Sequence, residues 1–243
     1  MKNWMIAIVA VFALGTVLFL SDRKVETPSG VDLIRNPTQY AEANGKAAAL
    51  AFEIFRKADS GGSITEDDKA KLREAEKYFE AMRLYNPTVV QSNFGAGKCF
   101  MLVGEKERAA ERFEQAVMNR NIDPEKDKPD FNLTVYESMA LLSEVTLDLA
   151  VEEIANRNSL SQANDPVGAA AAKKRSDNYF AKALDYSNQA VSAVPRAIRY
   201  LIGRANILLA LKRDADAKKD IARAKALDPN DPRVKMLAKL VGL

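Results

Sequence analysis

The chain has 243 residues, of which 47% are hydrophobic and 28% charged, so it is long enough for one elongated array or for one to two compact domains. Its 36 basic and 33 acidic residues give a net charge of +3, and this balance argues against a nucleic-acid partner, whose binding face needs an excess of positive charge. Histidine, the commonest metal ligand and general base, is absent, and the single Cys99 excludes an intramolecular disulfide. We therefore expect no cofactor, no metal site and no enzymatic activity.

An unbroken apolar run occupies residues 4–20 and is followed at once by a polar, charged segment. As a helix it rises about 25 Å, the lower limit for crossing a hydrocarbon core of about 30 Å, and flanking side chains can extend to the interface. A cleaved signal peptide would end in small residues, but cleavage after Ala13-Leu14-Gly15 would leave a strongly apolar new terminus. Residues 1–24 are therefore predicted to be an uncleaved transmembrane anchor with its flanks, in contact with the lipid bilayer through residues 4–20.

The short leading tail with one lysine is typical of bacterial signal-anchors. It predicts a single-pass membrane protein whose bulk is exported, to the periplasmic side of a bacterial inner membrane. The positive charges on the two sides of the run are nearly equal in number, so their count alone leaves the orientation open. Residues 25–37 contain two prolines and a glycine without sustained periodicity and are predicted to be a linker.

Two helices are predicted over residues 38–58 and 66–85, separated by a glycine-containing turn. Thr65 precedes three acidic residues, an arrangement typical of a capping box at the positive end of a helix. A calcium-binding loop is the alternative for this acidic segment. It would place Lys57 and Gly61 in ligand positions that require oxygen donors, so the capped turn is the preferred interpretation.

Small and aromatic residues recur with a regular spacing between residues 75 and 124, and again between Pro195 and Pro229, which are 34 residues apart. Small residues let two antiparallel helices approach closely, while the large side chains fill the space between one hairpin and the next. The first set is Ala75, Phe79, Met82, Pro87, Ala96, Gly97, Phe100, Ala109, Phe113, Ala116 and Pro124, and the second is Leu201, Ala205, Leu208, Ala217, Ile221, Ala224 and Pro229.

This pattern resembles the tetratricopeptide repeat, a helical hairpin of 34 residues. Asn93 and Arg204 depart from it, because both occupy positions that are usually apolar. The segment between the two clear copies is about as long as two repeats, so two repeats remain an alternative for residues 125–195.

One enlarged hairpin is the simpler interpretation of this segment. Residues 131–158 contain no helix-breaking residue and predict a long helix. A polar loop is predicted at residues 156–166, and a second long helix at residues 167–193. The tip of this hairpin is expected to project beyond the array.

A final helix over residues 231–240 is predicted to cap the array through a stripe of Val234, Leu237 and Leu240. The resemblance thus covers residues 38–243. It implies an all-α fold, a tetratricopeptide-like helical-hairpin solenoid of about four hairpins and a capping helix, behind the N-terminal transmembrane helix.

In this family the first helix of each hairpin lines a concave groove that binds protein partners. The resemblance therefore implies a protein-binding groove whose residues lie apart from the packing stripe. We expect Gly97 to lie at a close helix contact, whereas substitution of Lys98 should cost almost nothing. The expected groove residues are Gln91, Phe94, Lys98, Met101, Arg199, Ile202, Asn206 and Leu209.

Some family members grip a C-terminal carboxylate with lysine, arginine and asparagine side chains. Lys98, Arg199 and Asn206 are of these types but do not fall in consecutive repeats. The sequence predicts a membrane-anchored scaffold that binds one or more protein partners, for the assembly of an envelope complex. The alternative is a structural subunit of a larger membrane complex, held by its lateral surfaces and its apolar helix.

Overall fold

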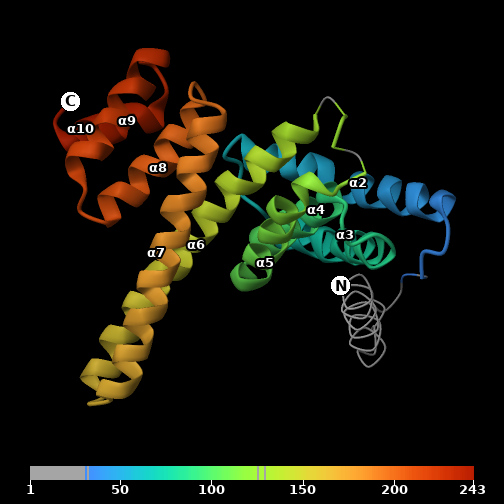
Figure 1. The fold of residues 1–243 in the computed structure, drawn as a ribbon, viewed down its shortest axis with the longest axis horizontal. Helices are drawn as coiled ribbons and strands as arrows, with labels where there is room; N and C mark the ends of the chain where they lie inside the picture. The colour runs from blue at the N-terminus through green and yellow to red at the C-terminus, as the bar shows by residue number, and fades with distance from the viewer. Residues whose placement is uncertain (1–30, 32, 125, 129) are drawn as a thin grey trace, which may run out of the picture.

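The computed structural model describes residues 31, 33–124, 126–128 and 130–243, and every regular element in this part of the chain is a helix (Figure 1). The predicted anchor at residues 4–20 lies outside the described residues, as does most of the predicted linker. Among the helices that are described, none combines the length and the apolar character needed to cross a membrane.

The helices pair in chain order as antiparallel hairpins, and each hairpin packs against the next (Figure 1). A 3₁₀ turn at Asn119–Asn121 follows the second hairpin. The described part of the chain thus confirms the predicted all-α array of four hairpins and a capping helix. The hairpins are α2 (Pro37–Asp59) with α3 (Glu66–Tyr85), α4 (Val90–Val103) with α5 (Lys106–Met118), α6 (Phe131–Gln162) with α7 (Pro166–Ala193), and α8 (Ile198–Ala210) with α9 (Asp214–Leu227), followed by α10 (Pro232–Val241).

The predicted capping box at the start of α3 is confirmed. Asp68 donates its backbone N–H to the Thr65 hydroxyl at 3.2 Å, and its carboxylate accepts the Thr65 backbone N–H at 2.9 Å. Lys57, in the last turn of α2, donates to the same carboxylate at 2.6 Å. The ammonium of Lys57 and the hydrogen bonds from Thr65 lower the pKa of Asp68 to about 2. The stabilisation that the ionised Asp68 carboxylate gives the fold is therefore present above its ordinary pKa and is lost progressively as the pH falls from about 4 towards 2.

The hairpin of α6 and α7 is a single long unit that extends beyond the array (Figure 1), as predicted. The predicted loop at residues 156–166 was wrong for residues 156–162, which continue α6 to Gln162. The turn is confined to residues 163–165, where Asn164 has φ 58° and Asp165 caps α7 through the backbone N–H of Gly168. Polar composition alone does not end a helix that is paired along its length; the Asn-Asp-Pro sequence does.

The buried residues form two cores that α6 joins. The first contains Phe100 and Phe113 and receives Leu141 from α6, and the second contains Leu201 and receives Val135 from α6. Each core therefore lies between hairpins, which is where the large residues of the repeat pattern were expected.

The capping stripe on α10 was only partly correct. Val234 and Leu237 are buried, but Leu240 is 72% exposed. Three-residue steps drift backwards around a helix of 3.6 residues per turn, so Leu240 lies about 120° away from Val234. Ala238 occupies the buried position in its place.

Candidate protein-binding groove

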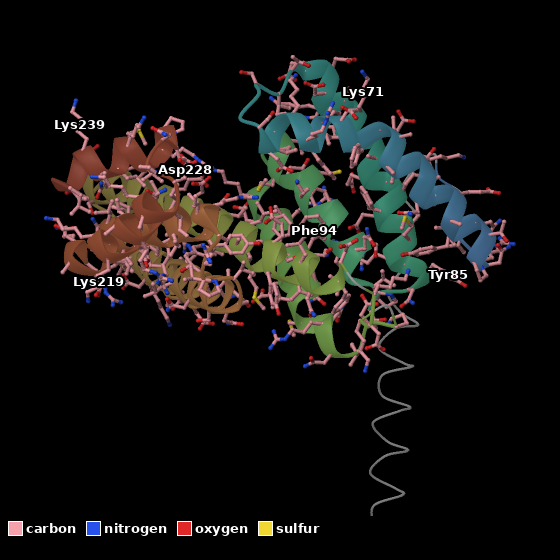
Figure 2. The ribbon with its side chains drawn as sticks, turned by 90° about the horizontal axis from the view of Figure 1, so that it is seen from above. Lys71, Tyr85, Phe94, Lys219, Asp228 and Lys239 are labelled. Atoms are coloured by element: carbon pink, nitrogen blue, oxygen red, sulfur yellow. The ribbon has the colours of Figure 1, made fainter. Side chains whose placement is uncertain are left out.

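A cavity of about 540 Å³ opens between α2, α4 and α6, the first helices of three successive hairpins. We call it the α2–α4–α6 groove. Figure 2 labels Phe94 of α4, one of its lining residues, among the helices of this half of the molecule. The size is within the range of sites that bind a small molecule or a few side chains of a partner.

The wall of the groove is aromatic and apolar. Phe52 of α2 and Leu133 of α6 both line it, and they are 63% and 60% exposed. Phe55 and Phe94 lie deeper and are partly buried. An apolar surface of this kind that gathers around a concavity indicates a binding site, whereas single exposed apolar residues are ordinary.

Gly95 allows the ring of Phe79, on α3, to pack closely against α4. A Cβ at this position would lie 2.4 Å from the ring of Phe79, which also lines the groove. Any side chain here would push this ring away from α4, so Gly95 shapes the groove rather than binding within it.

The prediction that substitution of Lys98 should cost almost nothing does not fit its surroundings, because the side chain is buried and paired. Lys98 is 4% exposed, and its ammonium lies 3.0 Å from each carboxylate oxygen of Asp59 at the end of α2. The same nitrogen lies 4.8 Å from the ring centroid of Phe55 and 5.7 Å from that of Phe94. Lys98 therefore links α4 to α2 beneath the groove, with its charge neutralised by Asp59.

Arg199 is also engaged within the chain. Its guanidinium forms an ion pair with Glu137 of α6, and lies 3.6 Å from a carboxylate oxygen of Glu144. The hydroxyl of Tyr200 donates to Glu137 at 3.2 Å, and burial together with this carboxylate raises the pKa of Tyr200. Glu137, which lines the groove, therefore ties α6 to α8.

The predicted site residues separate into two groups. Gln91, Phe94 and Lys98 line the α2–α4–α6 groove, whereas Met101 packs against the first core. The four predicted residues on α8 do not line it, because α6 packs between α4 and α8. On α8, Ile202 is buried, Leu209 packs against the second core, Arg199 pairs with Glu137, and Asn206 is exposed.

Sequence reasoning missed the contributions of α2 and α6. Phe52, Phe55, Asp59 and Leu133 all line the groove, and none was predicted. The rule that first helices line the groove would have pointed to α2 and α6, had it been extended to these less regular hairpins.

Two departures from the repeat pattern have structural roles. Asn93, fully buried, donates its amide to the Val89 carbonyl at 2.9 Å and to the Pro87 carbonyl at 3.2 Å, and so fixes the start of α4. Arg204 forms two hydrogen bonds of 2.7 Å with the buried carboxylate of Asp220 and thereby links α8 to α9.

Cys99 is buried at 1% exposure, and burial raises the pKa of its thiol. The thiolate, which is the reactive form, is therefore suppressed.

No protein-family model matches the chain, and no curated protein sequence matches it. Its similarities are to solved structures. MamA from residue 41 to its end, from Desulfovibrio magneticus RS-1, is 13% identical, with 77% of this chain and 97% of that chain covered and a TM-score of 0.28. The yeast Sti1 TPR2AB domain in its pHSP90 complex is 15% identical, with 86% and 100% covered and a TM-score of 0.25. Because both TM-scores are low, the tetratricopeptide likeness rests instead on the residue pattern of the α4–α5 and α8–α9 hairpins.

Proposed function

We propose that this protein is a membrane-anchored scaffold for protein–protein interaction. The α2–α4–α6 groove binds an apolar segment of a partner protein, and the N-terminal apolar run holds the array at a bilayer. The observation that carries the proposal is the pair of exposed side chains, Phe52 and Leu133, on the wall of a 540 Å³ groove. Large apolar side chains in such a position are typical anchors of binding energy.

The charges of the groove favour an internal segment of the partner over its C-terminal carboxylate. The two cations that line it are already paired with carboxylates of the described chain, Lys98 with Asp59 and Arg56 with Glu53. Capture of a carboxylate by the buried Lys98 would require breaking its pair with Asp59, which leaves the exposed Arg56 as the one lining cation within reach of a partner. Apolar anchors from an extended or helical segment need no such exchange.

The membrane part of the proposal is supported by the apolar run at residues 4–20 and its bacterial-type leading tail. An anchor raises the effective concentration of the groove for any partner at the same membrane. We propose that the array lies on the periplasmic side of a bacterial inner membrane, where it would assist the assembly of an envelope complex.

Replacing Phe52 and Leu133 together with serine should lower partner recovery, measured by crosslinking and pull-down from solubilised membranes, by on the order of tenfold or more. Thermal unfolding should change little, because both side chains are more than half exposed. The matched control is Met118→Ser, which removes a side chain of 65% exposure that does not line the groove. Undiminished recovery of the partner by the double variant would reject the groove as the binding site.

The alternative, a structural subunit of a membrane complex, is favoured by one observation. The projecting α6–α7 hairpin (Figure 1) exposes Val151 of α6 and Val167 at the start of α7, at 51% and 79%, and offers these side chains for a lateral contact. Replacing these two residues with serine should release the protein from a complex of fixed stoichiometry if the subunit model holds. Under the scaffold model the same change leaves partner recovery intact.

Attachment has its own test. The full chain should resist extraction from membranes by alkaline carbonate and should keep its N-terminal residues, because the apolar run lacks a good cleavage site. A chain that begins at residue 31 should be released and remain helical. A mature N-terminus at Thr16 or beyond would contradict the anchor.

A further inference from the structure

Positive charge is concentrated in the last hairpin and the capping helix. Residues 195–243 contain twelve lysines and arginines against five aspartates and no glutamate, a net charge of +7, whereas the whole chain carries +3. The preceding 194 residues therefore carry −4. The near balance of charge over the whole chain conceals a basic C-terminal end. The argument from net charge against a partner that needs positive charge therefore does not apply to this segment.

Most acids of this segment are already bonded within the fold. Asp220 is buried against Arg204, Asp216 bonds Arg213 and Lys219, and Asp231 bonds Arg233. Asp228 accepts the backbone N–H of Asn230 at the end of α9, which leaves Asp214 as the exposed acid of this segment.

The cations point outwards. Figure 2 shows Lys219 and Lys239 extending from the surface of this end of the molecule. Within the described part of the chain, five exposed cations of this segment have side chains that make neither a hydrogen bond nor an ion pair: Arg196, Lys212, Lys218, Lys225 and Lys239. This end of the array therefore presents an uncompensated positive surface.

The outward face of α10 is apolar at its centre. Met236 and Leu240, one helical turn apart, are 66% and 72% exposed. At 3.6 residues per turn, Arg233 and Lys239 lie about 60° on either side of Met236. The capping element of a helical array ordinarily has a polar outer face, so these two side chains need another explanation.

We propose that the outward face of α10, with the lysines around it, binds the surface of an anionic phospholipid bilayer. A convex helix that carries apolar side chains between cations is the arrangement by which interfacial helices bury their apolar face at the boundary of headgroups and acyl chains. Lysines close to the membrane surface add attraction to anionic headgroups.

Two other classes of partner fit this surface less well. A single-stranded nucleic acid would be bound with the help of exposed aromatic side chains, but the only aromatic residue in residues 195–243 is Tyr200, which is buried. An acidic protein would need carboxylates placed to match cations spread over the α8–α9 turn, α9 and α10. Mobile lipid headgroups can rearrange to meet them.

The inference adds a second membrane contact to the proposed function and does not depend on the groove. An anchor that precedes the array in the chain and a lipid-binding face on its last helix would together hold the groove close to the bilayer. The anionic lipid composition of the membrane would then regulate access to the groove.

The test uses the full chain in nanodiscs of phosphatidylcholine alone, or of three parts phosphatidylcholine to one part phosphatidylglycerol. Leu243→Cys places a thiol beside α10 for an environment-sensitive fluorophore, and Cys99 stays unlabelled because it is buried. We expect blue-shifted emission in the anionic nanodiscs only, and its reversal at about 0.5 M NaCl, where screening weakens the attraction. Equal emission in both compositions would overturn the proposal.

Variants separate this contact from other effects. Lys225→Gln, Lys235→Gln and Lys239→Gln together should abolish the response to anionic lipid, as should Met236→Ser with Leu240→Ser. The matched control, Val167→Ser with Lys174→Gln on the exposed tip of α7, should respond like the unchanged chain. A blue shift produced equally well by polyglutamate without anionic lipid would assign the surface to an acidic protein instead. Co-purification with the neutral nanodiscs reports the N-terminal anchor separately.

Discussion

Replacing Gly97 with leucine should lower the free energy of unfolding by about 3 kcal/mol or more, the upper part of the range for an overpacked core. A Cβ at this position would lie 2.7 Å and 2.8 Å from ring atoms of Phe113, which is fully buried. The ring therefore cannot move into solvent, and α4 and α5 must separate. Chemical denaturation followed by circular dichroism measures the effect.

Gly45→Ala is the matched control, because it adds a side chain to a helical glycine with no atom within 4 Å of the new Cβ. This substitution should stabilise the protein by about 1 kcal/mol, the difference in helix propensity between glycine and alanine. If Gly97→Leu were tolerated as well as Gly45→Ala, the close contact between α4 and α5 would not exist.

The contact at Gly97 could be predicted because its signal is local. Ala96, Gly97 and Phe100 lie within two turns of one helix, and their small and large side chains recur in a register that the chain repeats. The same local logic correctly gave the hairpin order, the Thr65 cap and the single long α6–α7 hairpin. Where the pattern depends on one helix and its immediate neighbour, the sequence contains enough information.

The environment of Lys98 could not be predicted in this way. Its partner, Asp59, is 39 residues away, at the end of a helix in the preceding hairpin. Lysine is ordinarily exposed, so neither residue type nor spacing indicates burial at this position. The groove was similarly predicted only in part, because the length of α6 places the exposed side chains of α8 on a different part of the array.

The ion pair of Lys98 and Asp59 gives the second prediction. Asp59→Ala should destabilise the protein by about 3 kcal/mol, because it leaves an ammonium group buried without its partner. Lys98→Met, which keeps the shape of the side chain, should change stability by less than about 1.5 kcal/mol. The asymmetry arises because the Lys98 side chain is 5% exposed, whereas that of Asp59 is 49% exposed and remains hydrated alone.

The double variant Asp59→Ala with Lys98→Met should recover most of the stability that Asp59→Ala loses, since no buried charge then remains. Glu53→Ala is the control, because it breaks an ion pair with Arg56 in which both side chains are about 70% exposed. Exposed pairs of this kind contribute about 0–1 kcal/mol, so Glu53→Ala should change the free energy of unfolding very little. Equal losses for Asp59→Ala and Lys98→Met would show instead that the ammonium group, through Phe55 and Phe94, stabilises the floor of the groove in its own right.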